Sequence, residues 1–378
     1  MKKFLLPIYF ILFLTSCFSE VNINKEESTL KEIPLKYASH LKIFQVQDHY
    51  IVKIRNPWDT TKTLHSYFII SDKNFKEDTV KKSDNEYTII KTPVEKALIF
   101  TSLHAGLIKN LGAKNSISSL CDVEYILDKE LQEDIKSGKI KDLGSSMTPD
   151  VEKIIVENPQ IIMLSPYQNS GGFPMLAKTK IPIIECADYM ENSPLAQAEW
   201  IKFYGLLFGK KDFADSIFSS VEENYLNLKK LAENSNKKAK LLPNSLIGAV
   251  WYMPAKKSTA AKFYLDAGFE YPFDYLEGFG TVPLNFETVL SKAYDCDIWL
   301  VKYNREKDYD TESFSKENPN YNKFKAFKEK NVYFCNLSYV PYYDEIPFQP
   351  DLLLKELIKI ANPEILKDYQ LRYFKKLK

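Results

Sequence analysis

The chain has 378 residues, of which 45% are hydrophobic and 27% are charged, and its formal net charge is +1. This balance is typical of a globular protein with room for two domains, and it excludes the broad basic surface by which proteins attract nucleic acid. The only arginines are Arg55, Arg305 and Arg372, which speaks against a site built from several bidentate Arg clamps.

The first residues have the pattern of an export signal. Lys2 and Lys3 precede an apolar stretch over residues 4–14 that is too short to span a bilayer. The run Leu14-Thr15-Ser16-Cys17 resembles the processing site of a bacterial lipoprotein, so we expect a signal peptide over 1–17 and a lipid on Cys17. An ordinary secretory signal with an incidental cysteine is the alternative. The mature chain is therefore expected outside the cytoplasm, anchored to the cell membrane, in a leaflet that the sequence does not determine.

Residues 18–92 are expected to form a polar tether followed by a small β-hairpin extension. Alternating or β-branched patterns over 44–47, 50–54 and 64–70 predict strands, and the turn-like residues 56–59 precede the last of them.

Short apolar runs alternate with helical patterns from Pro93 onward. The runs over 97–100, 116–120, 161–164 and 181–184 predict buried strands, and helices are expected to end near Gly112 and to cover 151–156. This rhythm predicts an N-terminal α/β lobe over 93–193 with a parallel sheet, whose loops after the strands gather at one edge.

One long amphipathic helix, or two nearly continuous helices, is expected over 194–236. The apolar stripe that predicts it consists of Phe213, Ile217, Val221, Tyr225, Leu228 and Leu231. We expect this helix to connect the first lobe to a second.

The α/β rhythm restarts over 237–378. Strands are predicted at 246–251, 298–301 and 332–335, and helices at 259–267, 286–293 and 351–360, with a helical continuation over 363–377. The prediction is a C-terminal α/β lobe.

Four cysteines remain after Cys17, namely Cys121, Cys186, Cys296 and Cys335, and no two of them form a CxxC pair. The cysteine spacing therefore does not favour a zinc site or a redox motif. Their pairing cannot be derived from the sequence, so disulfides and buried free thiols both stay open.

No catalytic motif is present: GxSxG, HExxH, GxGxxG and the P-loop are all missing from the sequence. We therefore expect that the protein is not an enzyme and that it has no catalytic residue, no cofactor and no bound metal. An extracytoplasmic hydrolase remains a lesser alternative.

Several stretches together resemble a known family. They are Leu111-Gly112-Ala113, residues 143–164 with Asp150-Val151-Glu152 and Asn158-Pro159, residues 193–201, and residues 350–364. In this order they resemble the helical-backbone (class III) periplasmic binding proteins, which serve ABC importers for iron-siderophore complexes, haem or vitamin B12. The resemblance runs from about Pro93 to the C-terminus and leaves the hairpin extension unexplained.

The resemblance implies a fold and a function. The fold is α/β, with two Rossmann-like lobes joined by a long linker helix. The function is that of a substrate-binding lipoprotein, here a monomer, that captures an iron chelate (a siderophore or haem) between its lobes and delivers it to the permease subunits. A cobalamin-binding (corrinoid) protein is the alternative, and a surface lipoprotein that captures chelates is a lesser one.

The resemblance also gives Glu152 and Glu287 the role of docking on the permease. Each follows an Asx residue and an apolar residue at the start of a predicted helix, in Asp150-Val151-Glu152 and Asn285-Phe286-Glu287. The alternative is that each carboxylate only complements its helix N-terminus.

Ligand-binding residues are expected in the loops after the strands, where aromatic faces would suit a macrocycle or a catecholate. The candidates are Ser102, Tyr125, Tyr167, Tyr189, Trp251, Tyr252, Tyr303 and Tyr342. One of Trp251 and Tyr252 should face the lobe interior. His104 is either a haem ligand or a histidine hydrogen-bonded within its helix.

Overall fold

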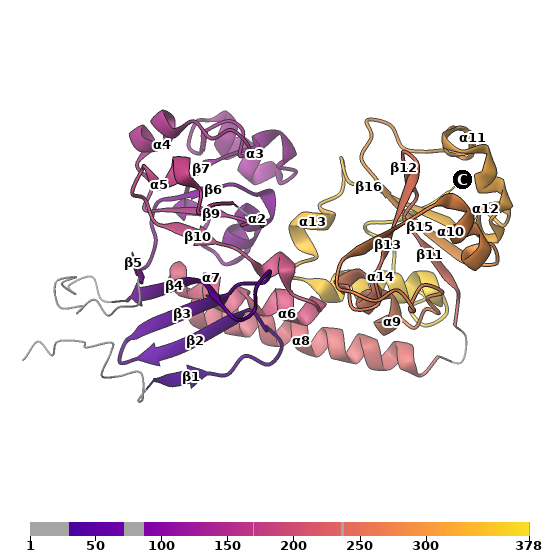
Figure 1. Cartoon of the computed structure of the whole chain (residues 1–378), viewed down its shortest axis with the longest axis horizontal. Coiled ribbons are helices and arrows are strands. Elements are labelled where there is room, and N and C mark those ends of the chain that lie inside the picture. The colour runs from indigo at the N-terminus through magenta and orange to yellow at the C-terminus, as the bar shows by residue number, and fades with distance from the viewer. Residues whose placement is uncertain (1–29, 72–86, 169, 236–237, 378) are drawn as a thin grey trace, which may run out of the picture.

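The computed structural model describes residues 30–71, 87–168, 170–235 and 238–377. The predicted signal peptide and Cys17 lie outside the described residues. Figure 1 shows two lobes side by side, with helix α8 (Lys211–Glu233) running beneath both and a separate β-sheet packed below the first lobe. The predicted two-lobed α/β fold with a linker helix is confirmed, while the exact lobe boundaries stay a prediction.

The N-terminal lobe is a parallel sheet with strand order β10-β9-β6-β7-β8. Its strands are β6 (Ala97–Ile99), β7 (Ile117–Leu120), β8 (Lys141–Asp142), β9 (Ile161–Leu164) and β10 (Ile183–Glu185). Its helices are α2 (Ser102–Asn110), α3 (Lys129–Lys136), α4 (Val151–Glu157) and α5 (Pro174–Ala177). The four residues of β9 are all buried, as expected for a strand covered on both faces.

Side-chain caps set the start of the helices that matter for the site. The Thr101 hydroxyl accepts from the backbone N–H of His104 and so begins α2. Asp150 caps α4 and Asn285 caps α10 (Phe286–Ala293) in the same way, each accepting from the backbone N–H three residues on.

The N-terminal extension is a five-stranded sheet rather than a hairpin. Its strands, in sheet order, are β1 (Lys31–Ile33), β2 (Leu41–Val46), β3 (His49–Arg55), β4 (Thr63–Ile70) and β5 (Thr88–Lys91). The outer strands β1 and β5 are too short to be recognised by their pattern alone. The loop before β2 is held by two buried carboxylates: Glu199 accepts three backbone N–H groups from residues 36–38, and Glu191 accepts those of residues 39 and 40.

Three helices make the connection between the lobes: α6 (Pro194–Glu199), α7 (Ile201–Leu207) and α8. The chain breaks between α7 and α8 at Gly209, whose φ is +64°. The predicted stripe is partly correct, since Val221 and Tyr225 are buried, but Phe213 and Leu231 are exposed. The buried face of α8 is rotated because α7 and the C-terminal helix α14 (Pro350–Ala361) pack against it.

The C-terminal lobe contains two sheets, with strand orders β11-β15-β16-β17 and β12-β13-β14. The strands are β11 (Leu241–Pro243), β12 (Leu246–Ile247), β13 (Val250–Pro254), β14 (Thr281–Leu284), β15 (Ile298–Tyr303), β16 (Val332–Asn336) and β17 (Lys375–Lys376). The helices, besides α10 and α14, are α9 (Thr259–Asp266), α11 (Thr311–Glu317), α12 (Lys325–Lys328) and α13 (Tyr342–Glu345).

Two predictions for this lobe are wrong. The stretch 246–251 is a hairpin and not one strand, because Gly248 turns the chain with φ +61°. Residues 363–377 do not continue the helix: the tail folds back and adds β17 to the sheet. The buried carboxylate of Glu356 holds it by accepting the backbone N–H groups of Arg372 and Tyr373 at 2.7 and 2.8 Å.

The four described cysteines are buried and unpaired. Burial raises the pKa of the Cys121, Cys296 and Cys335 thiols to about 12, so these are inert core residues. Of the two readings left open by the sequence, the structure supports free thiols.

Candidate ligand-binding site

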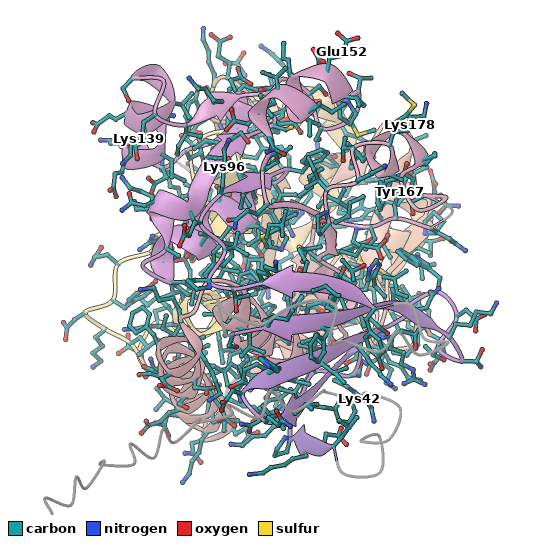
Figure 2. The ribbon with its side chains drawn as sticks, turned by 90° about the vertical axis from the view of Figure 1, so that its left-hand side faces the viewer. Lys42, Lys96, Lys139, Glu152, Tyr167 and Lys178 are labelled. Atoms are coloured by element: carbon teal, nitrogen blue, oxygen red, sulfur yellow. The ribbon has the colours of Figure 1, made fainter. Side chains whose placement is uncertain are left out.

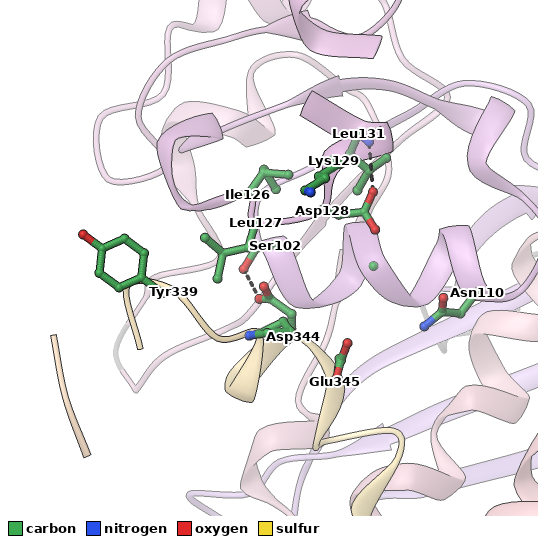
Figure 3. A pocket seen from close by; sticks show the side chains of 12 residues that line it. Ser102, Asn110, Ile126, Leu127, Asp128, Lys129, Leu131, Tyr339, Asp344 and Glu345 are labelled. Carbon is green, nitrogen blue, oxygen red and sulfur yellow. Dashed lines mark hydrogen bonds between the residues drawn. The ribbon is translucent and has the colours of Figure 1, made fainter. Parts of the chain in front are cut away.

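Helix α13 is the part of the C-terminal lobe that reaches the N-terminal lobe. In Figure 1 it lies between the two lobes, and it packs against α2. The Ser102 hydroxyl at the start of α2 donates a hydrogen bond to Asp344 of α13, as Figure 3 shows. Because parallel strands β6 and β16 end just before these two helices, the contact lies where ligand sites of open α/β lobes occur.

A cavity of about 310 Å³ opens beside this contact, between α2, residues 126–131 and residues 339–345 (Figure 3). Two of its carboxylates are neutralised: Asp128 by Lys109 at 2.6 Å, and Glu345 by Arg372 at 2.6 Å. Asp344 has the Ser102 hydroxyl as a partner, and its burial raises the pKa of this carboxyl. The cavity is therefore polar without a strong net charge.

A second cavity of about 450 Å³ lies in the C-terminal lobe, and Tyr339 lines both cavities. The ring of Tyr303, at the end of β15, lies 4.6 Å from that of Tyr309 in its wall. Tyr339, an exposed tyrosine, therefore borders both cavities.

A buried polar cluster lies at the start of α2. His104 is 1% exposed, and its Nε2 lies 3.1 Å from Asp188 while its Nδ1 lies 2.5 Å from the Thr101 hydroxyl. The Tyr204 hydroxyl donates to the same Asp188 oxygen at 2.8 Å. Burial acts to lower the pKa of His104, but Cys186 and Asp188 raise it to about 10. Both ring nitrogens are occupied, so His104 is the hydrogen-bonded histidine and not a haem ligand.

The predicted ligand residues fall into two groups. Tyr125, Tyr167, Tyr189 and Tyr252 are exposed, and the Tyr189 hydroxyl donates to the backbone of Pro166. Their part in binding stays a prediction. Trp251 is 0% exposed and stacks on Trp299 in the lobe interior, so its prediction as a ligand residue is wrong. Of Trp251 and Tyr252, Trp251 is the residue that faces the lobe interior.

Some residues at this site were missed because no local pattern marks them. Asp344 meets Ser102 only when the lobes pack together, and Lys302 meets Tyr342 only when β15 and α13 pack within the C-terminal lobe. Lys302, on β15, holds its ammonium 5.1 Å from the ring centre of Tyr342, which is itself buried. Lys302 is one charged residue near the end of a predicted strand, but nothing in the sequence indicates that it lies at the site.

The two glutamates expected to dock are both exposed, each as the second residue of a capped helix. In Figure 2 Glu152 stands at the top of the N-terminal lobe and points away from it, whereas Lys42 of the N-terminal sheet lies at the opposite end. Glu152 is thus presented on the side of the molecule away from α8.

Within the described ranges, three or more metal-ligating side chains do not gather anywhere, and no helix is long and apolar enough to cross a bilayer.

Comparison with known proteins identifies relatives over most of the chain. An uncharacterized lipoprotein of Methanocaldococcus jannaschii is 28% identical over 96% of this chain and 92% of its own length. The petrobactin-binding protein of Bacillus subtilis is 28% identical over 44% of this chain and 51% of its own length.

Solved structures share the fold. A possible iron-binding (periplasmic solute-binding) protein from Staphylococcus epidermidis superposes with a TM-score of 0.58 at 16% identity, over 72% of this chain and 100% of its own. A periplasmic haem-binding protein from Pseudomonas aeruginosa also gives 0.58, at 11% identity, over 75% of this chain and 98% of its own. The model of the periplasmic binding protein family matches residues 101–338. The chain therefore belongs to the periplasmic binding protein family, in the class whose two lobes are joined by a helix.

Proposed function

We propose that the protein captures an iron chelate between its lobes and delivers it to an ABC importer. The observation that carries this proposal is the smaller cavity, which lies where α13 of one lobe meets α2 of the other; Tyr339 lines both this cavity and the second one in the C-terminal lobe. Each cavity, at about 310 and 450 Å³, falls within the range of about 300–1,000 Å³ that is usual for small-molecule sites. The relative named for petrobactin and the neighbours named for iron or haem support an iron complex as cargo.

Delivery would use the exposed carboxylates Glu152 and Glu287 as two contact points for basic residues of the permease. Two charges on separate rigid lobes specify orientation better than they add affinity. A lipid on Cys17 would keep the protein at the membrane, and relatives named as lipoproteins support this anchoring. Binding rather than catalysis is the activity we infer, with the chain working as a monomer.

Isothermal titration calorimetry of residues 18–378 tests the cargo. The ligands are a neutral ferric trihydroxamate, a trianionic ferric tricatecholate, haem and cobalamin. We expect saturable binding of at least one iron complex. Binding of cobalamin alone would select the corrinoid alternative, and no binding of any of the four would overturn the chelate proposal.

A variant that fills the cavity locates the site. Gly106 lines the smaller cavity, and a Cβ placed there would lie 3.7 Å from the Asp344 carbonyl oxygen. Gly106→Leu should therefore abolish binding, whereas Ser291→Leu on the exposed face of α10 should leave it unchanged. Thermal unfolding of both variants checks that they are folded. Unaltered binding by Gly106→Leu would place the ligand elsewhere.

A further inference from the structure

Lys302 is a largely buried lysine in an aromatic setting at the C-terminal lobe's side of the site. It lies near the end of β15, and its Nζ is 5.1 Å from the ring centre of Tyr342 and 5.7 Å from that of Tyr343. Both tyrosines belong to α13, which lies between the lobes (Figure 1). A third tyrosine, Tyr264 of α9, is close enough to interact electrostatically with the same ammonium.

This ammonium has no counter-charge. Among the residues that the structure describes, Lys302 makes no ion pair and no hydrogen bond, and the hydroxyls of Tyr264, Tyr342 and Tyr343 have no hydrogen-bond partner either. By contrast, Lys109 at the neighbouring cavity contacts both Asp128 and Glu130. Lys302 is partly buried, so its ammonium loses part of its hydration and gains no partner in return, which is costly.

The cation is nevertheless kept charged. Burial acts to lower the pKa of Lys302, but Tyr342 and Tyr343 raise it above the ordinary value for lysine. Ring faces stabilise an ammonium by their negative charge density, but they leave its N–H groups unused. The cluster therefore offers one ammonium and three phenolic hydroxyls as donors, with no acceptor supplied by the described protein.

We propose that Lys302, with the hydroxyls of Tyr264, Tyr342 and Tyr343, is the anion-binding part of the ligand site. This inference rests on the proposed function and deepens it: the cargo carries an anionic oxygen group that meets Lys302. Tyr343 is 55% exposed, which leaves the cluster open from the side of α13. Because Asp128 and Glu345 are neutralised by their own cations, the adjoining cavity does not repel such a group. The group is either a carboxylate, as in haem, or a catecholate oxygen.

Calorimetric titration of two variants tests whether the charge of Lys302 contributes to ligand binding. Lys302→Met keeps the length of the side chain and removes the ammonium, whereas Lys302→Arg keeps the charge. Lys307→Met, at an exposed position of the same lobe, is the matched control. Lys302→Met should weaken binding of the anionic chelate at least about tenfold, the scale of a lost hydrogen bond to a charged group, and leave the neutral ferric trihydroxamate unaffected. Lys302→Arg and Lys307→Met should bind as the wild type does. Loss for haem identifies a carboxylate, and loss for the tricatecholate identifies a catecholate oxygen.

Three results would overturn the inference. The first is full affinity of Lys302→Met for the anionic chelate, and the second is a wild type that binds the neutral chelate alone; both leave the proposed function intact. The third is independent of any ligand. If Lys302 served the fold, Lys302→Met would unfold at a lower temperature, whereas removal of an unmatched charge should leave the midpoint unchanged or raise it. A wild type that binds no chelate overturns the proposed function. In that case the unfolding midpoint of Lys302→Met still shows whether Lys302 serves the fold.

Discussion

At the scale of single residues, the first feature is a buried charged pair, formed by His104 and Asp188. His104 and Asp188 are both 1% exposed, and they lie 3.1 Å apart between α2 and the start of the connecting helices. The rings of Tyr204 and Phe348 enclose the pair, and Phe348 comes from the C-terminal lobe. Because Phe348 contacts His104, the pair lies where the C-terminal lobe packs against α2.

Stability should depend on pH through His104. Its pKa is raised from 6.5 to about 10 on folding, so the stabilisation is complete below pH 6.5 and is lost as the pH rises toward 10. We expect the thermal unfolding midpoint to fall over that interval. Asp188→Asn, which removes the charge partner, should destabilise the fold by about 3–5 kcal/mol and flatten this fall. Equal pH profiles for the wild type and the variant would contradict the assignment.

At the scale of elements, the N-terminal sheet closes the edge of the first lobe. The Tyr67 hydroxyl of β4 accepts from the N–H of Glu185 at 2.9 Å and donates to the carbonyl of Ile183 at 3.1 Å. Both partners belong to the edge strand β10. An open edge is a template for aggregation, so the extension protects this strand.

Tyr67→Phe should lower the free energy of unfolding by about 1–3 kcal/mol, because it leaves a buried N–H and a buried carbonyl without their partner. Denaturant titration measures the change. Tyr50→Phe, on the neighbouring strand β3, is the control, since its side chain is only partly buried. Equal losses in the two variants would mean that the hydroxyl contacts with β10 do not matter.

The junction of α7 and α8 depends on the absence of a side chain. A Cβ on Gly205 would lie 2.5 Å from the Cβ of Ala214 and 3.2 Å from the Lys210 carbonyl oxygen. Gly205→Ala should therefore destabilise the protein by about 1–3 kcal/mol, although alanine favours helices. Chemical unfolding is the measurement, and a more stable variant would show that α7 and α8 separate easily.

At the scale of the whole molecule, a helical connection spans both lobes. A stiff linker limits hinge motion, so affinity should rest on a largely preformed site rather than on wide closure. Glu152 and Glu287, which we propose to dock on the permease, should then keep a nearly constant separation when the ligand binds.

Joint replacement of Glu152 and Glu287 by Ala should abolish uptake of the cargo by cells while its affinity in calorimetry stays unchanged. Each carboxylate lies outside both cavities, so ligand contacts are preserved. Glu124→Ala with Glu277→Ala, two other exposed glutamates, is the matched control. Normal uptake by the first pair would favour a lipoprotein that passes its chelate to another receptor.

The sequence by itself determined the elements whose signals are local. The parallel strands β6, β7, β9, β15 and β16 are short apolar runs, and α4 and α10 begin at the Asx caps that the sequence shows. These features depend on hydrophobic periodicity and on hydrogen bonds within three residues, so neighbouring residues are sufficient to predict them.

Only the tertiary structure decided the rest. The tail β17 and the outer strands β1 and β5 exist because distant strands supply their hydrogen bonds, and Trp251 is buried because Trp299 lies opposite it. The proposed ligand site is of this kind too: Ser102 meets Asp344 across 242 residues of chain. Contacts between residues so far apart depend on how the lobes pack, and no local pattern encodes that packing.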